Sequence, residues 1–381
     1  MPNRRPTIAL YTSSHGFGHA VRCSILCVAL RAASPDLRVV VKTGAPAWIF
    51  PSDVEVERCT IDTGVVQPSS LEIDAAATLE RYAATVAHEE TVIRDEAAWL
   101  RQIGARAVVG DVPAAAFEIA DRAGVPGIGL ANFSWDWIYE PFVEERPAYA
   151  PLLAHLRAQY GRASRLLRLP FHGDLGAFPI IEDIPAIARR STADRTETRR
   201  RFGLPLDTPL VLFSFGGHQS ERPDEDRLAR LGEYAFATTA PGRPPTPTLA
   251  TTPSGEPADG ITATRRGRNL FVLPQLAGAY VDLLAACDVV VTKPGYGIVA
   301  DTIANRVPVL YASRGGFREE PILVEALETE ARAIALDREA LAALDLRPAL
   351  DRLAALDRPW TTRPIDGAAV AARRILDLAG C

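Results

Sequence analysis

The chain has 381 residues, which is enough for two domains of ordinary size that each bury a core of their own. Apolar residues make up 48% and charged residues 23% of the sequence, a globular composition that excludes intrinsic disorder and fibrous architecture. The net charge is −5 and no long run of Lys or Arg occurs, so we expect no nucleic-acid partner.

The N-terminal segment lacks the features of a secretion signal. Its apolar run, residues 7–12, is too short for a signal core and meets polar residues and glycine at once. No stretch approaches the roughly 18 to 20 apolar residues that a membrane-spanning helix needs. The five cysteines form no CxxC pair, which suits a reducing compartment. We therefore expect a cytoplasmic protein without a transmembrane segment.

The first half of the chain alternates short apolar runs with longer helical patterns. This alternation is typical of βαβ units that form a parallel sheet. Segments 19–33 and 71–103 can form helices between the strands. The expected strands are 7–12, 37–43, 107–110 and 127–131. Together these elements predict a doubly wound sheet.

A second series of strands follows a mixed stretch rich in proline and arginine at 141–204. It begins at LVLFSFGG (210–217) and continues with strands expected at 234–238, 269–273, 289–292 and 308–311. We place the boundary near Arg190, which gives predicted domains of 1–190 and 191–381. The fold class is α/β, with two Rossmann-like, doubly wound parallel-sheet domains facing a cleft.

Two further segments belong to the second half. Residues at about 239–261 are rich in Pro, Thr and Gly with almost no apolar content, which predicts a flexible loop. The last helical pattern, about 367–378, can pack on either domain.

The first candidate site is SSHGFGHA (13–20), which follows the first strand and opens a helix. Ligands of open parallel sheets bind outside the carboxyl ends of strands, and Gly18 allows close approach of the backbone. The third glycine of GxGxxG is missing, so no nicotinamide or flavin cofactor is expected. The positive end of the helix dipole favours a neutral imidazole at His19, as a general base needs. The alternative is that His15 and His19 cap and pack the turn.

The second candidate site is NFSWDWIY (132–139), at the end of another strand. Aromatic faces beside Asn132 and Asp136 suit a hydroxyl-rich acceptor, which can stack on Trp135. Asp111, also at a strand end, is expected in the same region. The alternative is that these aromatic residues only pack.

Two glycine-containing loops in the second half can hold phosphates against bare backbone. The first strand ends in SFGGH (214–218) with Gly216 and Gly217, and a later strand ends in TKPGYGI (292–298). In the later loop Lys293 can supply a counter-charge. The candidate donor-binding residues of this loop and the helix after it are Lys293, Gly295, Tyr296, Gly297 and Asp301. Two such loops on one sheet predict nucleotide binding, with Asp301 within reach of a ribose.

Two acidic clusters remain. Glu319 and Glu320 can accept hydrogen bonds from sugar hydroxyls, or else simply favour a helix N-terminus. Asp224-Glu225-Asp226 resembles a metal-binding DxD but follows Pro223 at an expected helix start. We therefore predict no metal.

The order of these motifs resembles the GT-B glycosyltransferases, especially the branch of the bacterial cell-wall N-acetylglucosaminyltransferase and the plant galactolipid synthases. It is similar also to the glycosyltransferase-like region that precedes the kinase domain of plant L-arabinokinases. The matching stretches are SSHGFGHAVR, ANFSWDWIY, TKPGYGIVADTIANRVPVL and FREEP. The resemblance implies that His19 lies on the acceptor side and the glycine loops lie near the diphosphate. It also places Asp301 at the ribose and Glu319 and Glu320 near the donor sugar.

The sequence departs from the family at two positions. The family's ribose-binding acid is usually Glu, whereas Asp301 is one methylene shorter, and Thr302 stands where Ala is usual. The phosphate loop of arabinokinase-type sugar kinases is absent from the sequence, so we predict no kinase activity.

These observations predict a glycosyltransferase that moves a sugar from a nucleotide-diphosphate donor to a small-molecule or glycan hydroxyl acceptor, with inversion and without a metal. The expected donor is a UDP-sugar, which is a substrate, so no cofactor is predicted. Two alternatives stay open: a nucleotide-sugar epimerase of the same fold, and a non-catalytic nucleotide-sugar-binding module.

Overall fold

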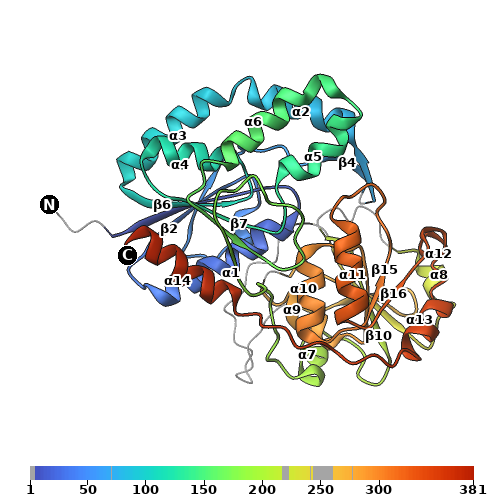
Figure 1. Cartoon of the computed structure of the whole chain (residues 1–381). Coiled ribbons are helices and arrows are strands. Elements are labelled where there is room, and N and C mark those ends of the chain that lie inside the picture. The colour runs from blue at the N-terminus through green and yellow to red at the C-terminus, as the bar shows by residue number, and fades with distance from the viewer. Residues whose placement is uncertain (1–4, 70, 217–222, 241, 243–260, 277) are drawn as a thin grey trace. The chain divides into compact units, whose positions relative to one another are not determined.

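The computed structural model describes residues 5–69, 71–216, 223–240, 242, 261–276 and 278–381 (Figure 1). The chain divides into two compact units. Unit 1 contains the chain up to Ala188 together with 315–323 and 363–381, and unit 2 contains 189–314 and 324–362. The loop expected at about 239–261 lies, apart from its edges, outside the described residues.

Unit 1 is built on a seven-stranded sheet in which neighbouring strands pair in parallel. The spatial order is β3 (Glu55–Arg58), β2 (Arg38–Thr43), β1 (Thr7–Thr12), β6 (Ala105–Asp111), β7 (Gly127–Ala131), β8 (Arg165–Arg168) and β9 (Ile181–Asp183). Chain order therefore reverses between β1 and β6, which is the switch point where doubly wound sheets bind ligands. Strands β3, β8 and β9 were not predicted; β3 reads EVER and carries no apolar run.

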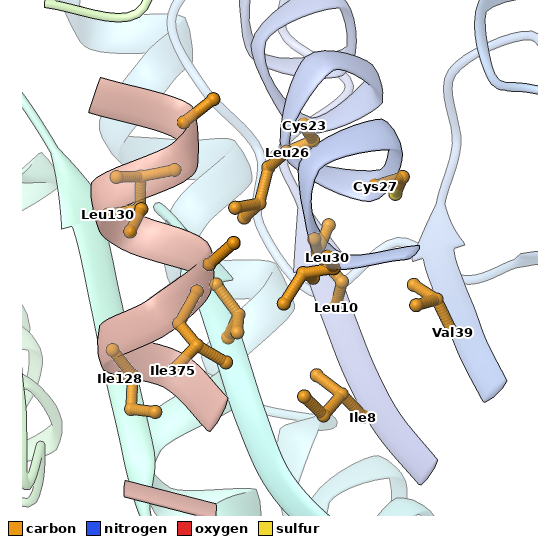
Figure 2. Packing of buried hydrophobic residues seen from close by; sticks show 14 of the residues in the cluster. Ile8, Leu10, Cys23, Leu26, Cys27, Leu30, Val39, Ile128, Leu130 and Ile375 are labelled. Atoms are coloured by element: carbon orange, nitrogen blue, oxygen red, sulfur yellow. The ribbon is translucent and has the colours of Figure 1, made fainter. Parts of the chain in front are cut away.

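Alternate residues of β1 face opposite sides of this sheet. Ile8 and Leu10 join the core beneath α1 (Phe17–Ala33) and α14 (Gly367–Ala379), as Figure 2 shows. Ala9 and Tyr11 join the core on the other face, beneath α3 (Glu89–Ile103) and α4 (Ala115–Ala123). Burial on both faces explains why β1 is a continuous apolar run. The sequence did not predict which domain the final helix packs on. In the structure it packs on unit 1.

Most of the remaining elements of unit 1 come between β3 and β8 in the sequence. They are η1 (Ala47–Ile49), β4 (Val66–Ser69), β5 (Glu72–Asp74), α2 (Ala75–Val86), α5 (Trp135–Glu144), η2 (Pro147–Tyr149) and α6 (Ala150–Tyr160). The helical segment expected over 71–103 is two helices preceded by a short strand. Asp74 starts the first by accepting a hydrogen bond from the N–H of Ala77, and Glu89 and Glu90 occupy the first turn of the second.

Unit 2 contains a second seven-stranded sheet. Its spatial order is β12 (Thr264–Arg266), β13 (Leu270–Leu273), β11 (Ala235–Thr239), β10 (Leu210–Ser214), β14 (Val289–Thr292), β15 (Val309–Tyr311) and β16 (Ala333–Ala335). The edge strand β12 is antiparallel and the other pairs are parallel. The switch point of this sheet lies between β10 and β14.

Helices cover both faces of the second sheet. They are α7 (Arg195–Arg201), α8 (Glu225–Leu228), α9 (Tyr280–Ala286), α10 (Tyr296–Asn305), α12 (Arg338–Ala343) and α13 (Arg347–Ala354), and α11 (Glu320–Glu330) begins in the segment grouped with unit 1. Leu350 and Leu353 of α13 pack with Phe213 in the core. Asp224 caps α8 by accepting from two backbone N–H groups, which is the helix-start role the sequence offered instead of metal binding. Among the described residues, no helix is long and apolar enough to span a bilayer.

Candidate functional site

His19 and Asp111 meet at the switch point of the first sheet. His19 lies in the first turn of α1, directly after β1, and Asp111 is the last residue of β6, the strand beside β1. Gly16, at the N-cap of α1, has a φ of 74°, a conformation that glycine adopts without strain. The Nδ1 of His19 is 2.7 Å from the Oδ1 of Asp111. The two side chains therefore form a buried acid–imidazole pair.

Arg22, one turn further along α1, holds the same carboxylate. Its guanidinium donates to the two oxygens of Asp111 from Nε at 2.8 Å and Nη2 at 2.5 Å, and the thiol of Cys23 is 3.3 Å from Oδ2. Burial alone would raise the pKa of the Asp111 carboxyl, but the charges and hydrogen bonds of Arg22 and His19 lower it well below its usual range. Asp111 is therefore a carboxylate.

The charge state of Asp111 fixes the tautomer of His19. A carboxylate only accepts hydrogen bonds, so the Nδ1 of His19 must carry the proton that it shares with Asp111. In a neutral imidazole the other nitrogen, Nε2, is then an acceptor. Chemically, such a pair can act as a general base with an orienting acid.

An aromatic cluster lies beside this pair. The ring of His19 makes an edge contact with Phe133 at 5.5 Å between centroids, Phe133 contacts Trp135 at 5.0 Å, and Trp135 stacks on Tyr139 at 5.6 Å. These side chains are buried, as the packing alternative for NFSWDWIY predicted. A role of Trp135 in acceptor binding stays a prediction.

Asp62 is a buried carboxyl in this region that sequence reasoning missed. The indole Nε1 of Trp135 donates to its Oδ2 at 2.9 Å. Burial raises the pKa of Asp62, against the lowering effect of hydrogen bonds from Ser13 and Trp135. The stretch around it, CTIDTGV (59–65), mixes apolar and polar residues, so no local sequence signal marks this acid.

The other predicted acceptor residues are Gly18, Asn132 and Asp136, and not all of them contact the His19–Asp111 pair. Asn132 accepts from the Nη1 of Arg22 and donates to the backbone oxygen of Pro170 at 2.5 Å. Gly18 is the second residue of α1 and is exposed, next to His19. Asp136 lies in the first turn of α5, where Arg157 donates to it at 3.3 Å. The structure thus brings Gly18 and Asn132 to the His19 pair, whereas Asp136 is held by Arg157.

The glycine loops of unit 2 flank the switch point of the second sheet. Ser214 of β10 lies opposite Thr292 of β14, and the Thr292 hydroxyl donates to the backbone oxygen of Ser214 at 2.6 Å. Gly216 follows β10 with a φ of 73°, and Gly217 lies outside the described residues. The two loops therefore share one edge of the sheet, as predicted.

The later loop leads into the N-terminus of α10. Gly295 is the N-cap residue, Tyr296 is the first residue and Gly297 the second, and Lys293 directly follows β14. A methyl group on the Cα of Gly297 would meet nothing within 4 Å among the described residues outside its own turn of α10. The first N–H groups of this helix lack intrahelical acceptors, so this end can bind an anion.

The remaining predicted donor residues have partners within the protein. Asp301 of α10 is buried and accepts hydrogen bonds from Arg189. Glu319 and Glu320 belong to the segment 315–323, which is grouped with unit 1. Arg318 in that segment donates to Glu140 at 2.8 Å and to the backbone oxygen of Trp137. Contacts of Glu319 and Glu320 with a donor stay predictions.

No family model matches the chain. The L-arabinokinase of Arabidopsis thaliana is 30% identical over 379 residues. The match covers 97% of this chain and 34% of the relative, so the chain spans about a third of the length of the curated relative it matches.

Two solved structures show the architecture. The glycosyltransferase VinC, in complex with dTDP, matches with a TM-score of 0.57 at 16% identity, over 98% of this chain and 95% of that one. A UDP-glucosyltransferase from Polygonum tinctorium matches with a TM-score of 0.55 at 14% identity, over 100% of both chains. With the two doubly wound sheets, these likenesses show that the chain has the GT-B fold. The resemblance inferred from the motifs is thereby confirmed at the level of fold.

Proposed function

We propose that the chain is a glycosyltransferase that moves a sugar from a nucleotide-diphosphate donor to a hydroxyl acceptor. The observation that carries this proposal is the His19–Asp111 pair, in which Asp111 engages the Nδ1 of His19, at the switch point of a GT-B unit. The glycine loops at the switch point of unit 2 support a donor site.

In the proposed reaction, the Nε2 of His19 removes the proton of the acceptor hydroxyl as its oxygen attacks the anomeric carbon. The bond from that carbon to the diphosphate breaks, and its electron pair leaves with the diphosphate. Backbone N–H groups at the start of α10 would stabilise the departing charge. Asp111 stays ionised and stabilises the imidazolium that forms. Direct displacement inverts the anomeric centre, and no step requires a metal.

A UDP-sugar is the proposed donor. This choice is supported by the likeness to a protein named as a UDP-glucosyltransferase and to another in complex with the related pyrimidine nucleotide dTDP. The proposed acceptor class is a small-molecule or glycan hydroxyl, and the cytoplasmic location expected from the cysteines remains a prediction.

A non-catalytic nucleotide-sugar-binding module is the second candidate. It is favoured by the match to about a third of a protein named for a kinase activity. The two candidates share donor binding and differ in turnover.

A ligand screen followed by product analysis tests the proposal. Thermal unfolding is compared with UDP-, dTDP-, GDP- and ADP-sugars, with and without a chelator, because binding to the folded state raises Tm. We expect a chelator-insensitive rise with UDP-sugars and, in mixtures of hydroxyl acceptors, products that are heavier by one sugar residue. Binding without any transfer would support the module, and a changed sugar still linked to its nucleotide would identify an epimerase. No rise with any nucleotide would contradict the donor site.

A further inference from the structure

Arg189 forms a hydrogen-bonded ion pair with the carboxylate of Asp301. The backbone N–H of Arg189 donates to Oδ1 at 2.8 Å, and its guanidinium donates to Oδ2 from Nε at 2.9 Å and from Nη2 at 2.5 Å. The guanidinium also lies over the ring of Tyr280, 5.1 Å from its centroid. Asp301 is 3% exposed. Both of its oxygens are therefore engaged, and the charge-assisted bonds are of the stronger kind.

The residues around this ion pair fasten the segment 189–191 to two helices of unit 2. Asn305 of α10 donates from Nδ2 to the backbone oxygen of Arg189 at 2.8 Å and accepts from the N–H of Ser191 at 2.9 Å. The hydroxyl of Ser191 donates to the Oδ1 of Asp282, on α9, at 2.7 Å. Arg189 is the first residue of unit 2, so these bonds secure the start of the unit.

We propose that Asp301 anchors this segment and does not bind a ribose, so that the nucleotide site accepts ribonucleoside and 2′-deoxyribonucleoside diphosphates alike. A ribose diol would have to displace Arg189 and leave a largely buried guanidinium without its carboxylate. Separating such a pair costs more than two hydroxyl hydrogen bonds return. The short side chain of Asp301 keeps its carboxylate close to α10, within reach of the backbone N–H of Arg189.

The first test compares UDP with 2′-deoxy-UDP by titration calorimetry on the full chain. The inference rests on the proposed function for this test alone. We expect the two Kd values to agree within about twofold in the wild type and in Asp301→Asn, since no hydroxyl–carboxylate bond is gained or lost. A preference for UDP of about tenfold or more, which disappears in Asp301→Asn, would overturn the inference.

The second test is a double-mutant cycle in thermal unfolding with Arg189→Gln, Asp301→Asn and the double variant. We expect each single variant to lower Tm, and the double variant to lower it by less than the sum, because the first change already breaks the shared bonds. Arg190→Gln is the control, since the Nε of Arg190 donates to a backbone oxygen, that of Ala304. We expect the control to combine additively with Asp301→Asn.

The two tests separate this inference from the proposed function. If neither nucleotide binds, the donor site fails, and the cycle alone decides the role of Asp301. Additive losses for Arg189→Gln and Asp301→Asn would then reject the anchor, whereas coupled losses would support it.

Discussion

The Nδ1 of His19 and the Oδ1 of Asp111 lie 2.7 Å apart although the residues are separated by 92 positions in the sequence. They meet because β1 and β6 are neighbours with their carboxyl ends at the same edge of the sheet. Arg22 neutralises the acid, so the proton in this contact belongs to Nδ1, and in a neutral imidazole Nε2 is then the acceptor.

Substituting Asp111→Asn should lower kcat more than it changes KM. The amide can accept or donate toward Nδ1, so His19 loses its enforced tautomer and the imidazolium loses its counter-charge. We expect kcat to fall by about 10²- to 10⁴-fold, the range of general-base catalysis. Steady-state kinetics with a UDP-sugar and a hydroxyl acceptor measure this effect. Unchanged kcat in a folded variant would show that Asp111 only holds Arg22.

The stability of unit 1 should fall in acid because of Asp111. The folded-state pKa of this carboxyl is depressed, so its contribution is present above the unfolded value of about 3.9 and is lost as the pH falls through the folded pKa. Four of the five tryptophans lie in unit 1, so fluorescence in urea reports on this unit. Between about pH 5 and 2, the urea midpoint of the wild type should fall more steeply than that of Asp111→Asn. Parallel slopes would contradict the assigned charge state.

The contribution of Asp62 to stability should depend on pH in the opposite sense to that of Asp111. Its pKa is raised by burial, so its contribution is complete below the unfolded value and is lost as the pH rises through the folded pKa. The urea midpoint of Asp62→Asn relative to wild type should therefore increase from about pH 4 to pH 7. Trp135 keeps an acceptor in this variant, since the amide oxygen can replace Oδ2. An equal difference at both pH values would count against a raised pKa.

Gly297→Ala should separate folding from nucleotide binding. In the described part of the chain, the added methyl group meets nothing within 4 Å beyond its own helical turn, and alanine favours a helix over glycine by up to about 1 kcal/mol. We expect Tm to stay the same or rise, whereas UDP binds more weakly because the methyl group occupies the proposed diphosphate position. Gly18→Ala on α1 is the matched control, since its methyl group is equally unobstructed. If Gly297→Ala binds UDP like the control, α10 does not hold the diphosphate.

Arg199 should contribute strongly to the stability of unit 2. Its buried guanidinium donates to Asp288 at 2.7 Å and to the backbone oxygen of Ala286 at 2.9 Å. Arg199→Met removes these bonds, whereas the partly exposed Asp288 keeps Arg195 as a partner, so we expect a loss of about 1 to 3 kcal/mol. Arg200→Met is the adjacent control, because its exposed pair with Glu197 is worth under about 1 kcal/mol. The free energy of unfolding is measured by calorimetry, and equal losses for Arg199→Met and Arg200→Met would contradict this prediction.

The fold and the centre of the candidate site could be predicted because local patterns encode them. The buried strand β1 is a continuous apolar run, and the glycines beside His19 mark the turn into α1. Strand β3, which reads EVER, has no such pattern and forms by pairing with β2. Long-range partners leave no local trace: Arg189 and Asp301 are 112 positions apart, and Asp62 pairs with Trp135 from another element. These contacts join helix and loop residues that only the tertiary fold brings together, and residue spacing does not encode that.

Transfer of sugar from a UDP-sugar by wild type and His19→Ala tests the central claim most directly. Both proteins are first titrated with UDP, because His19 belongs to unit 1 and the proposed donor loops belong to unit 2. We predict equal UDP affinity, measurable transfer by the wild type and a loss of about 10²- to 10⁴-fold in kcat for His19→Ala. Wild-type turnover by His19→Ala at neutral pH would contradict the account.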